Sequence, residues 1–594
     1  MGATATENGC EFRLWAPFAR QVRIQRLSED GSISRELPME PVEDGHFILQ
    51  AQVGSGDRYF CVVDDHKPVP DPVSRLLPEG VHGPTQICDP EQFRWNDSGW
   101  RGLPLKDYVI YEIHVGAFTP EGTFEAAIEK LPYLKDLGIT VIELMPVAAF
   151  PGTRNWGYDG VSLYAVQASY GGPDGLRQLV DAAHDLGLGV MLDVVYNHLG
   201  NEGNYLRSFG PYFTPRHETP WGEAINYDQP GCEGVRRYVV ENALYWIREY
   251  HLDGLRLDAV QTIRDDSNPH ILSEIAERVH EAAQKLDRRI CVIAETDEND
   301  EKLVRPHALG GYGLDAIWSD DFHHSIHAFF TGERKGYYQD FGDPQKIARA
   351  LNEGFVFQGE PFRFWKGRPR GTSSHAMPAP AHVICIQNHD QVGNRAHGER
   401  LTALVPICVR MVAAALLLLA PQTPLLFMGQ EWDEANPFQF FTNFGDPALQ
   451  AAVSEGRRNE FKDFDFGDIP DPQDPATFER SRLNWNRSLN EDAMLAWYSS
   501  LLALRRRCVA NGPRTCKARL HNGVLRMETP ANEPKLLVLA RIQETAPLPE
   551  SGPEWTKVLA REGEGVEIAV YAAESAGVPD CATADGNETE GAPS

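Results

Sequence analysis

Short apolar runs alternate with amphipathic helical patterns along the middle of this chain, beginning near residue 106. Such alternation predicts βα units and a parallel sheet. The runs are Tyr108–His114, Ile139–Met145, Gly189–Tyr196, Leu252–Asp258, Ile290–Glu295, Leu314–Trp318, His382–Asn388 and Pro424–Met428. Because eight parallel strands close a TIM-type barrel, we predict an α/β fold built on a (β/α)8 barrel over residues 96–507.

Helical patterns fill the intervals between these runs. They cover Phe124–Leu137, Gly175–Leu186, Val235–Tyr250, Ile271–Leu286 and Thr402–Leu419, and a last helix is predicted over Asp492–Arg507. The interval 197–234 is too long for a simple βα loop. We therefore expect an inserted excursion over the barrel mouth near residues 197–234.

The segments on either side of the predicted barrel have sequence patterns typical of β-strands. Residues 1–95 alternate apolar and polar side chains between Gly, Asp and Pro turns, which predicts an N-terminal β-sandwich. Residues 508–573 contain three strand-like runs and predict a C-terminal antiparallel β-domain. Residues 574–594 have almost no large apolar side chain, so we expect a disordered tail.

The net charge indicates which binding partners to expect, and the cysteines indicate the cellular compartment. A net charge of −29 repels phosphate backbones and anionic membranes, so we expect neither nucleic acid nor membrane as a partner. The longest apolar run, Met411–Ala420, is too short to span a bilayer. The N-terminus lacks a secretory signal pattern, and ten scattered cysteines without CxxC spacing are typical of free thiols. We predict a cytoplasmic protein.

Polar residues gather where four of the predicted strands end. The segments are Asp193–His198, Arg256–Asp258, Ile293–Thr296 and Ile386–Gln391. In a closed barrel the C-terminal ends of the strands form the active face. A single acid at a strand end is most often an ordinary cap, but four such segments in register, after the third, fourth, fifth and seventh strands, indicate a functional site.

The carboxylates in these segments suit the cleavage of a glycosidic bond. Retaining cleavage needs one ionised nucleophile and one carboxylic acid whose pKa is raised. Side chains two apart in a strand share a face, so Arg256 lies beside Asp258 and suits it for the first role. Glu295 follows an apolar run without an adjacent cation, which suits the second role. Asp390 could hold sugar hydroxyls and stabilise positive charge on the ring.

The competing use of such a cluster is metal binding, because Asp, Glu, His and Asn are all metal ligands. No HxH or HExxH spacing is present, and the cation at Arg256 is a poor neighbour for a metal ion. We predict no metal and no other cofactor.

The four segments resemble, in order, the four motif regions of the α-amylase superfamily of glycoside hydrolases. The resemblance implies Asp258 as nucleophile, Glu295 as general acid/base and Asp390 as transition-state stabiliser. It also implies substrate-binding roles, in the subsite of the cleaved bond, for Tyr158, His198, Arg256 and His389. Asp193 and Asn197 match positions that are structural in many members, and Asn197 matches one that binds calcium in some. The other calcium ligands are not recognisable here.

A narrower resemblance is to the malto-oligosyltrehalose trehalohydrolase family within this superfamily. It rests on Asp193–Tyr205, Thr219–Asn226, Pro437–Thr442 and Glu455–Phe461, and on the order of sandwich, barrel and β-domain. One departure is Asn443-Phe444, where the family pattern leads us to expect an Asp-His pair. The resemblance implies a maltooligosyl trehalose or α-glucan substrate, hydrolysis of the α-1,4 bond next to the terminal trehalose, and release of trehalose.

Aromatic rings are candidates for recognising that substrate, because the apolar face of a sugar packs on a ring. The candidates are Trp156, Trp221, Phe438, Phe440 and Phe441. Loop packing is the commoner use of such a cluster. Two other functions stay open at this point. An α-glucan branching or debranching enzyme would carry the same carboxylates, and a non-catalytic glucan-binding scaffold is the other alternative, against which the intact trio argues.

Overall fold

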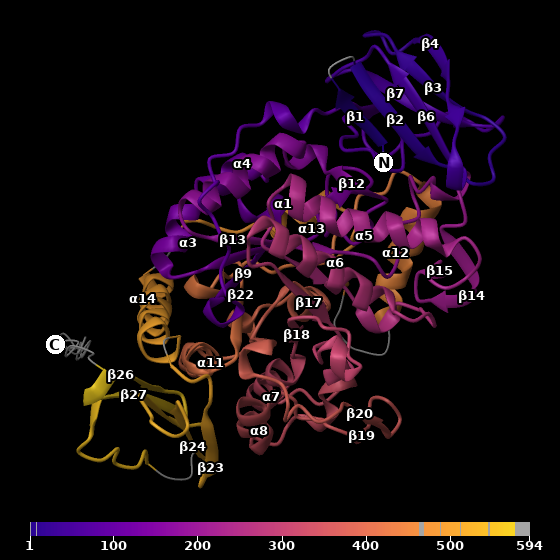
Figure 1. Ribbon diagram of the computed structural model, residues 1–594. Coiled ribbons are helices and arrows are strands. Elements are labelled where there is room, and N and C mark those ends of the chain that lie inside the picture. Colours follow the sequence, from indigo (N-terminus) through magenta and orange to yellow (C-terminus); the bar gives the residue numbers. More distant parts are fainter. Residues whose placement is uncertain are drawn as a thin grey trace.

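The eight predicted strands form one closed parallel barrel in the computed structural model, which describes residues 2–6, 9–461, 468–486, 489–510, 512–543 and 547–576. The strands are β9 (Ile110–Ile113), β10 (Val141–Leu144), β13 (Gly189–Val194), β16 (Gly254–Leu257), β17 (Cys291–Glu295), β18 (Ala316–Trp318), β21 (His382–Cys385) and β22 (Thr423–Phe427). They close in this order, with β22 paired to β9 (Figure 1). The predicted barrel is confirmed.

The register of the barrel brings the strand ends to one rim. Asp193 of β13 is paired with Arg256 of β16, and Glu295 of β17 is paired with Trp318 of β18. Because all eight strands run parallel, every residue that follows a strand lies at this same rim. The four polar segments therefore meet, although about two hundred residues of sequence separate the first from the last.

Two predicted helices are each interrupted by a proline. The pattern over 124–137 gives α2 (Phe124–Ile128) and α3 (Leu131–Leu137), with Pro132 in the first turn of α3. The pattern over 402–419 gives α10 (Leu401–Leu404) and α11 (Ile407–Leu419), with Pro406 at the start of α11. A proline has no N–H to donate, and it disfavours helical backbone in the residue before it. The prediction of one continuous helix was wrong in both places.

The other predicted helices are present with small shifts of their ends. They are α4 (Gly172–Asp185), α5 (Cys232–Glu249), α6 (Ile271–Leu286) and α14 (Leu489–Leu504), the last of which continues into a π-helical turn over Arg505–Val509.

The N-terminal β-sandwich is confirmed as two four-stranded antiparallel sheets, seen in indigo at one end of the molecule (Figure 1). One sheet contains β1 (Gly2–Thr6), β2 (Gly9–Trp15), β6 (His46–Ala51) and β5 (Glu40–Pro41). The other contains β4 (Ile33–Pro38), β3 (Val22–Leu27), β7 (Arg58–Val63) and β8 (Thr85–Gln86). Phe12 and Tyr59 join the sheets through an edge-to-face contact with ring centroids 5.0 Å apart.

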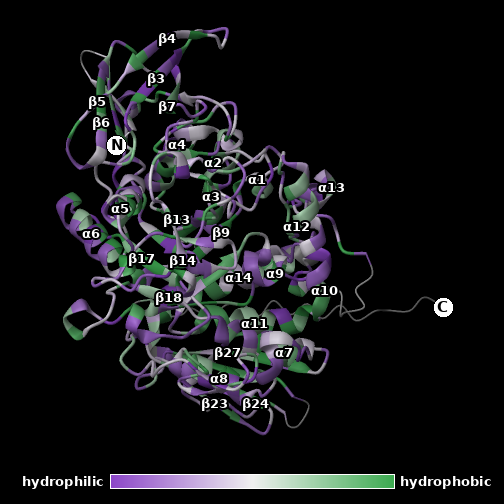
Figure 2. Ribbon diagram, turned by 90° about the vertical axis from the view of Figure 1, so that its right-hand side faces the viewer, coloured by the Kyte–Doolittle hydropathy of each residue, from purple (hydrophilic) through white to green (hydrophobic). Residues whose placement is uncertain are grey.

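The C-terminal β-domain is one five-stranded antiparallel sheet at the opposite end of the molecule (Figure 1). Its strands, in spatial order, are β23 (Lys517–His521), β24 (Val524–Thr529), β25 (Leu536–Arg541), β27 (Val566–Ala573) and β26 (Trp555–Gly563). Strands β25, β26 and β27 contact α11, which Figure 2 shows as a largely hydrophobic helix. Most of the predicted tail, residues 577–594, lies outside the described residues. The exact boundaries between the three units stay predictions.

Two insertions rise from the rim of the barrel. The predicted excursion contains a hairpin of β14 (Phe213–Thr219) and β15 (Gly222–Ile225). The second insertion, between β18 and β21, was not predicted. It contains α7 (Asp320–Thr331), α8 (Gln345–Glu353), β19 (Glu360–Phe362) and β20 (Arg368–Arg370).

Asp321 ties the second insertion to the barrel. Its fully buried carboxylate accepts hydrogen bonds from Arg370 Nη1 at 2.6 Å and from Asn299 Nδ2 at 2.8 Å. The backbone N–H groups of Val356 and Phe357 donate to the same carboxylate at 2.6 and 3.1 Å. A buried charge with this many donors fixes the start of α7 in place.

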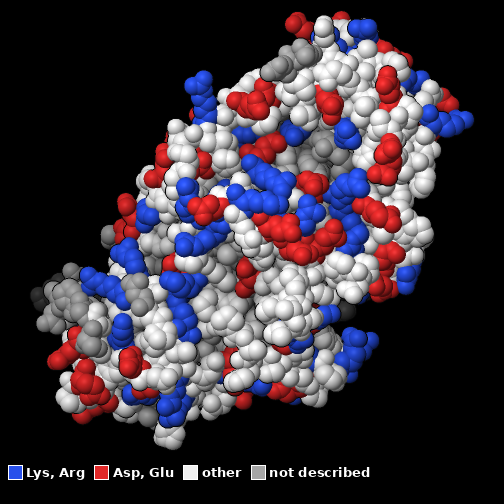
Figure 3. Space-filling view, viewed as in Figure 1, with Lys and Arg blue, Asp and Glu red and all other residues white. Residues whose placement is uncertain are grey.

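The outer surface carries both signs of charge. Figure 3 shows acidic side chains spread among basic ones over the face it presents. Within the part of the chain that the structure describes, no helix combines the length and the apolar character that crossing a bilayer requires.

Arg505 links the end of the last helix to the segment between α11 and β22, and its replacement tests how much this link stabilises the fold. The guanidinium is buried and donates to the carbonyl oxygens of Leu418, Ala420 and Gln422 at 2.9, 2.7 and 2.6 Å. Arg505→Ala leaves these carbonyls unpaired, so we expect a loss of about 3 kcal/mol in the free energy of unfolding. Urea unfolding measures it. The matched control, exposed Arg507→Ala, should change stability by less than about 0.5 kcal/mol, and equal effects would contradict the assignment.

Candidate active site

The Arg256 guanidinium lies at the centre of the rim residues. The residue is 2% exposed. Its Nη1 lies 2.7 Å from Asp193 Oδ2 and 2.8 Å from Asp258 Oδ1, and its Nη2 lies 3.6 Å from Glu295 Oε2. The guanidinium also lies 4.3 Å from the centre of the Trp318 ring. One cation therefore faces three carboxylates and rests on an aromatic ring.

Asp258 is held from two sides. Besides Arg256, the side chain of Asn197 donates to Asp258 Oδ2 at 3.2 Å. Asn197 Nδ2 also donates to Thr262 Oγ1 at 3.1 Å, which fixes the amide. The two donors leave the Asp258 carboxylate one orientation at the end of β16, and its side chain remains 12% exposed at the rim.

Glu295 is positioned by the residue that follows Asp258. The backbone N–H of Ala259 donates to Glu295 Oε2 at 2.7 Å. Ala259 has φ 39°, in the left-handed region that residues with a Cβ rarely adopt. Burial raises the pKa of Glu295 well above its ordinary value; Arg256 opposes this shift, and Asp258, Asp320 and Asp390 add to it. This environment therefore favours the protonated form of the Glu295 carboxyl group.

No cation is adjacent to Glu295 in the sequence, but Arg256 reaches it from the neighbouring strand. Burial outweighs this cation, so the direction of the predicted pKa shift is the one the structure has.

Asp390 and His389 follow β21 and begin the short helix α9 (His389–Gly393). Asn394 Nδ2 donates to Asp390 Oδ1 at 2.6 Å. His389 is buried, with its Nδ1 2.5 Å from Glu112 Oε1 and its backbone N–H donating to Glu112 Oε2 at 2.9 Å. Burial lowers the pKa of His389, but the Glu112 carboxylate outweighs burial and the net shift is upward.

Tyr158 connects the two halves of the site. Its hydroxyl lies 2.8 Å from His389 Nε2 and donates to Asp193 Oδ2 at 2.5 Å, and its ring stacks on that of His389. Burial raises the pKa of Asp193 to about 6, although Arg256 opposes the shift. The hydrogen bonds of Tyr158 therefore run from Glu112 through His389 to the cluster around Arg256.

The predicted excursion brings Trp221 onto the site. Trp221, in the turn between β14 and β15, stacks on His198 with ring centroids 4.0 Å apart and planes 7° apart. His198 Nε2 lies 3.0 Å from the backbone oxygen of Tyr158, and burial lowers the pKa of His198. Trp221 keeps 43% of its surface exposed, so one face of the indole is available beside the catalytic rim.

Comparison with known proteins places this site in a family. Residues 88–218 match the model of the alpha amylase catalytic domain. The malto-oligosyltrehalose trehalohydrolase of Saccharolobus solfataricus is 48% identical over 85% of this chain and 86% of its own length. That of Arthrobacter ramosus is 46% identical over 84% and 88%. The chain belongs to the malto-oligosyltrehalose trehalohydrolase family.

The same comparison extends to a solved structure. A Salmonella typhimurium protein, provisionally described as an alpha amylase, is 42% identical and superposes with a TM-score of 0.88 over 96% of this chain and 99% of its own. The trehalohydrolase family is thus a glycosidase family of the α-amylase type, as the four motif segments predicted.

The predicted aromatic residues divide by exposure in this trehalohydrolase family member. Phe438 and Phe441 are fully buried, and Phe441 packs on Phe478. Trp156 is buried too, stacked on Phe438 and bonded through Nε1 to the backbone oxygen of Gln439 at 3.0 Å. Phe440 is half-buried. Trp156, Phe438 and Phe441 therefore pack behind the site, whereas Trp221 and Phe440 keep accessible surface. Direct contact of these rings with a sugar stays a prediction.

The departure Asn443-Phe444 has a structural use. Asn443 Oδ1 accepts a hydrogen bond from the backbone N–H of Thr153 at 3.1 Å, and Phe444 is buried. Asn443 therefore closes the loop that follows β10.

Sequence reasoning missed two acids of the site. Glu112 lies inside an apolar run, where a lone carboxylate needs a buried partner, and that partner is His389. Asp320 directly follows the sixth strand, so the rule that found Glu295 and Asp390 applied to it as well. The partner of Glu112 could not be predicted from neighbouring residues in the sequence. Asp320 could have been predicted, because it too comes after the C-terminal end of a barrel strand.

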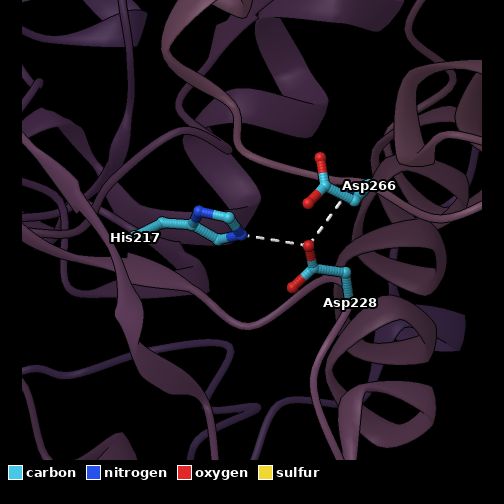
Figure 4. Close-up of side chains that lie close together, drawn as sticks. All are labelled: His217, Asp228 and Asp266. Atoms are coloured by element: carbon cyan, nitrogen blue, oxygen red, sulfur yellow. Dashed lines mark hydrogen bonds and ion pairs between the residues drawn. The ribbon is translucent and has the colours of Figure 1, made fainter.

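A separate cluster of His217, Asp228 and Asp266 has the composition of a metal site (Figure 4). His217 Nε2 lies 3.0 Å from Asp228 Oδ2, and the backbone N–H of Asp266 donates to the same oxygen at 3.1 Å. Arg216 lies 2.8 Å from Asp266 Oδ2 and 3.9 Å from Asp228 Oδ2. This guanidinium already compensates both acids, so ion pairing accounts for the cluster.

Glu112→Gln tests the buried pair with His389 in this family member. Because the pKa of His389 is raised, the pair stabilises the fold fully below about pH 6.5 and less as pH rises through the folded-state pKa. We expect Glu112→Gln to lower the free energy of unfolding by about 3 kcal/mol at pH 6 and by less at pH 9, measured by urea unfolding.

Glu143→Gln is the matched control. Glu143 of β10 is paired in register with Glu112, and burial raises its pKa well above the ordinary value, which favours the neutral carboxyl. Replacing it by an amide should cost less than about 1 kcal/mol at either pH. A pH-independent loss in Glu112→Gln would contradict the assignment.

Proposed function

We propose that this chain is a retaining glycoside hydrolase that cleaves the α-1,4 glucosidic bond next to the terminal trehalose of maltooligosyl trehalose and releases trehalose. The observation that carries the mechanism is the Arg256 guanidinium between Asp258 and Glu295. Two carboxyl groups that flank one cation lie close enough to act on the same bond. The substrate follows from the name shared by the relatives that match most of the chain.

Asp258 is the nucleophile in this proposal. Its carboxylate attacks the anomeric carbon of the maltooligosyl residue, and a covalent glycosyl-enzyme bond forms as the bond to trehalose breaks. Glu295 gives its proton to the departing trehalose oxygen, which its raised pKa permits at neutral pH. Glu295 then takes a proton from water, whose oxygen attacks the anomeric carbon and releases Asp258.

Asp390 and the residues around it hold the sugar at the cleaved bond. Asp390 retains exposed surface at the rim and accepts one hydrogen bond from Asn394, so lone pairs remain for sugar hydroxyls. His389, His198 and Tyr158 present polar atoms or ring faces in fixed positions. The hydrogen bonds that Tyr158 donates to Asp193 and that His389 donates to Glu112 supply that rigidity.

Trp221 and Phe440 are the proposed acceptor-side aromatics. A sugar presents an apolar C–H face, and the free side of the Trp221 indole is suited to pack against it. His198 supports the opposite side of the indole at 4.0 Å, so the ring is already oriented before a ligand arrives.

Asp258→Asn and Glu295→Gln test the catalytic assignment. We expect each to lower kcat for trehalose release from maltooligosyl trehalose by at least about a thousandfold, because each removes a group that acts in the transition state. Trehalose is measured by chromatography. The control substrate is a maltooligosaccharide without the trehalose end. Activity that persists in Asp258→Asn contradicts the nucleophile, and preferential cleavage of α-1,6 bonds by the unmodified protein identifies a debranching enzyme instead.

Trp221→Ala tests the acceptor-side assignment. Loss of the stacking surface should raise KM for maltooligosyl trehalose about 5- to 30-fold, the equivalent of about 1–2 kcal/mol, with a smaller change in Trp221→Phe. The control is Phe18→Ala, which removes the most exposed ring of the N-terminal sheets. If Phe18→Ala raises KM as much as Trp221→Ala, the binding surface lies elsewhere.

A cytoplasmic location is part of the proposal. The nine cysteines in the described residues are all unpaired, and several of them, including Cys61 and Cys385, are buried. Free buried thiols are typical of proteins from reducing compartments.

A further inference from the structure

Asp320 lies between two of the proposed catalytic carboxyls. In the barrel β18 has β17 on one side and β21 on the other, so the rim presents Glu295, then Asp320, then Asp390. Asp320 begins α7, two residues beyond Trp318, and Trp318 is the register partner of Glu295. Three neighbouring strands thus place three acids side by side.

Asp320 differs from the acid next to it. Asp321 is fully buried and accepts hydrogen bonds from Arg370, Asn299 and two backbone N–H groups. Asp320 is partly exposed, and within the described ranges no hydrogen bond or ion pair reaches its carboxylate. Because Asp321 fixes the start of α7, the backbone of Asp320 is held in place although its own carboxylate oxygens make no hydrogen bond to the described residues.

Several titratable groups surround the two acids, and Tyr337 and Cys385 are among those that interact with Asp320. Arg256, Asp258, Asp320 and Asp390 act on Glu295. Asp390, Arg370, Asp321 and Asp297 act on Asp320, and burial together with Asp390 raises the pKa of Asp320 to about 7. Arg370 is engaged with Asp321 at 2.6 Å, and among the described residues no cation forms an ion pair with Asp320.

We propose that Asp320 is a positioning residue of the hydrolytic site, whose carboxylate charge holds the catalytic proton on Glu295 until the leaving group takes it. A negative charge beside a carboxylic acid disfavours its ionisation. Arg256, on the other side of Glu295, favours ionisation, and Asp320 joins burial, Asp258 and Asp390 in offsetting the guanidinium. The inference rests on the proposed function of Glu295.

The pH dependence of kcat/KM tests it. The alkaline limb reports loss of the proton from the general acid in the free enzyme. Asp320→Asn removes the charge and keeps the shape, so we expect this limb to move to lower pH by roughly one unit. Asp320→Glu keeps the charge and should leave the limb in place. Glu298→Gln, which removes an exposed acid three residues past Glu295, is the matched control and should also leave it in place.

Each outcome decides the matter. An unmoved limb in Asp320→Asn overturns the inference, whether or not KM rises; a raised KM with an unmoved limb would make Asp320 a contact for sugar hydroxyls. Because Asp320 accepts no hydrogen bond from the fold, Asp320→Ser is a second charge-free variant, and it should show the same shift. Turnover by Glu295→Gln would refute the proposed function instead, so the two failures are distinguishable.

Discussion

The site depends on one buried guanidinium. Arg256 neutralises Asp193, orients Asp258 and approaches Glu295, and Trp318 covers one of its faces. A planar group with five donors in fixed directions can satisfy several carboxylates at once, which a lysine cannot. Removing the cation would leave uncompensated acids inside the barrel mouth. The catalytic geometry and the local stability of the rim are therefore two results of the same contacts.

The fold could be predicted well because its main signals are local. Each barrel strand is a contiguous apolar run, and its position in the chain fixes its place in the closed sheet. Asp258, Glu295 and Asp390 follow from this directly, since each comes at the end of a strand. The two proline breaks were also visible in the sequence, at Pro132 and Pro406. They were missed because hydrophobic periodicity continues across each break.

What the sequence did not provide is contact between strands. The approach of Arg256 to Glu295 joins two strands, and the pair of Glu112 with His389 joins a strand to the start of α9, so their distances depend on register and side-chain direction. The burial of Phe441 could not be predicted either, because the sequence does not show whether an aromatic residue in a loop faces the core or a ligand. Asp320 is a different case: its place just after the sixth strand could be predicted, but the absence of a hydrogen-bond partner for its carboxylate among the described residues could not.

The hairpin of β14 and β15 forms a two-stranded sheet of its own, and much of its surface is exposed. A hairpin with this much exposed surface opens at a lower free energy than the closed barrel beneath it. Trp221 moves with this hairpin, whereas Asp258 and Glu295 belong to the barrel. It follows that the position of Trp221 and the positions of the two carboxyl groups have separate energetic thresholds.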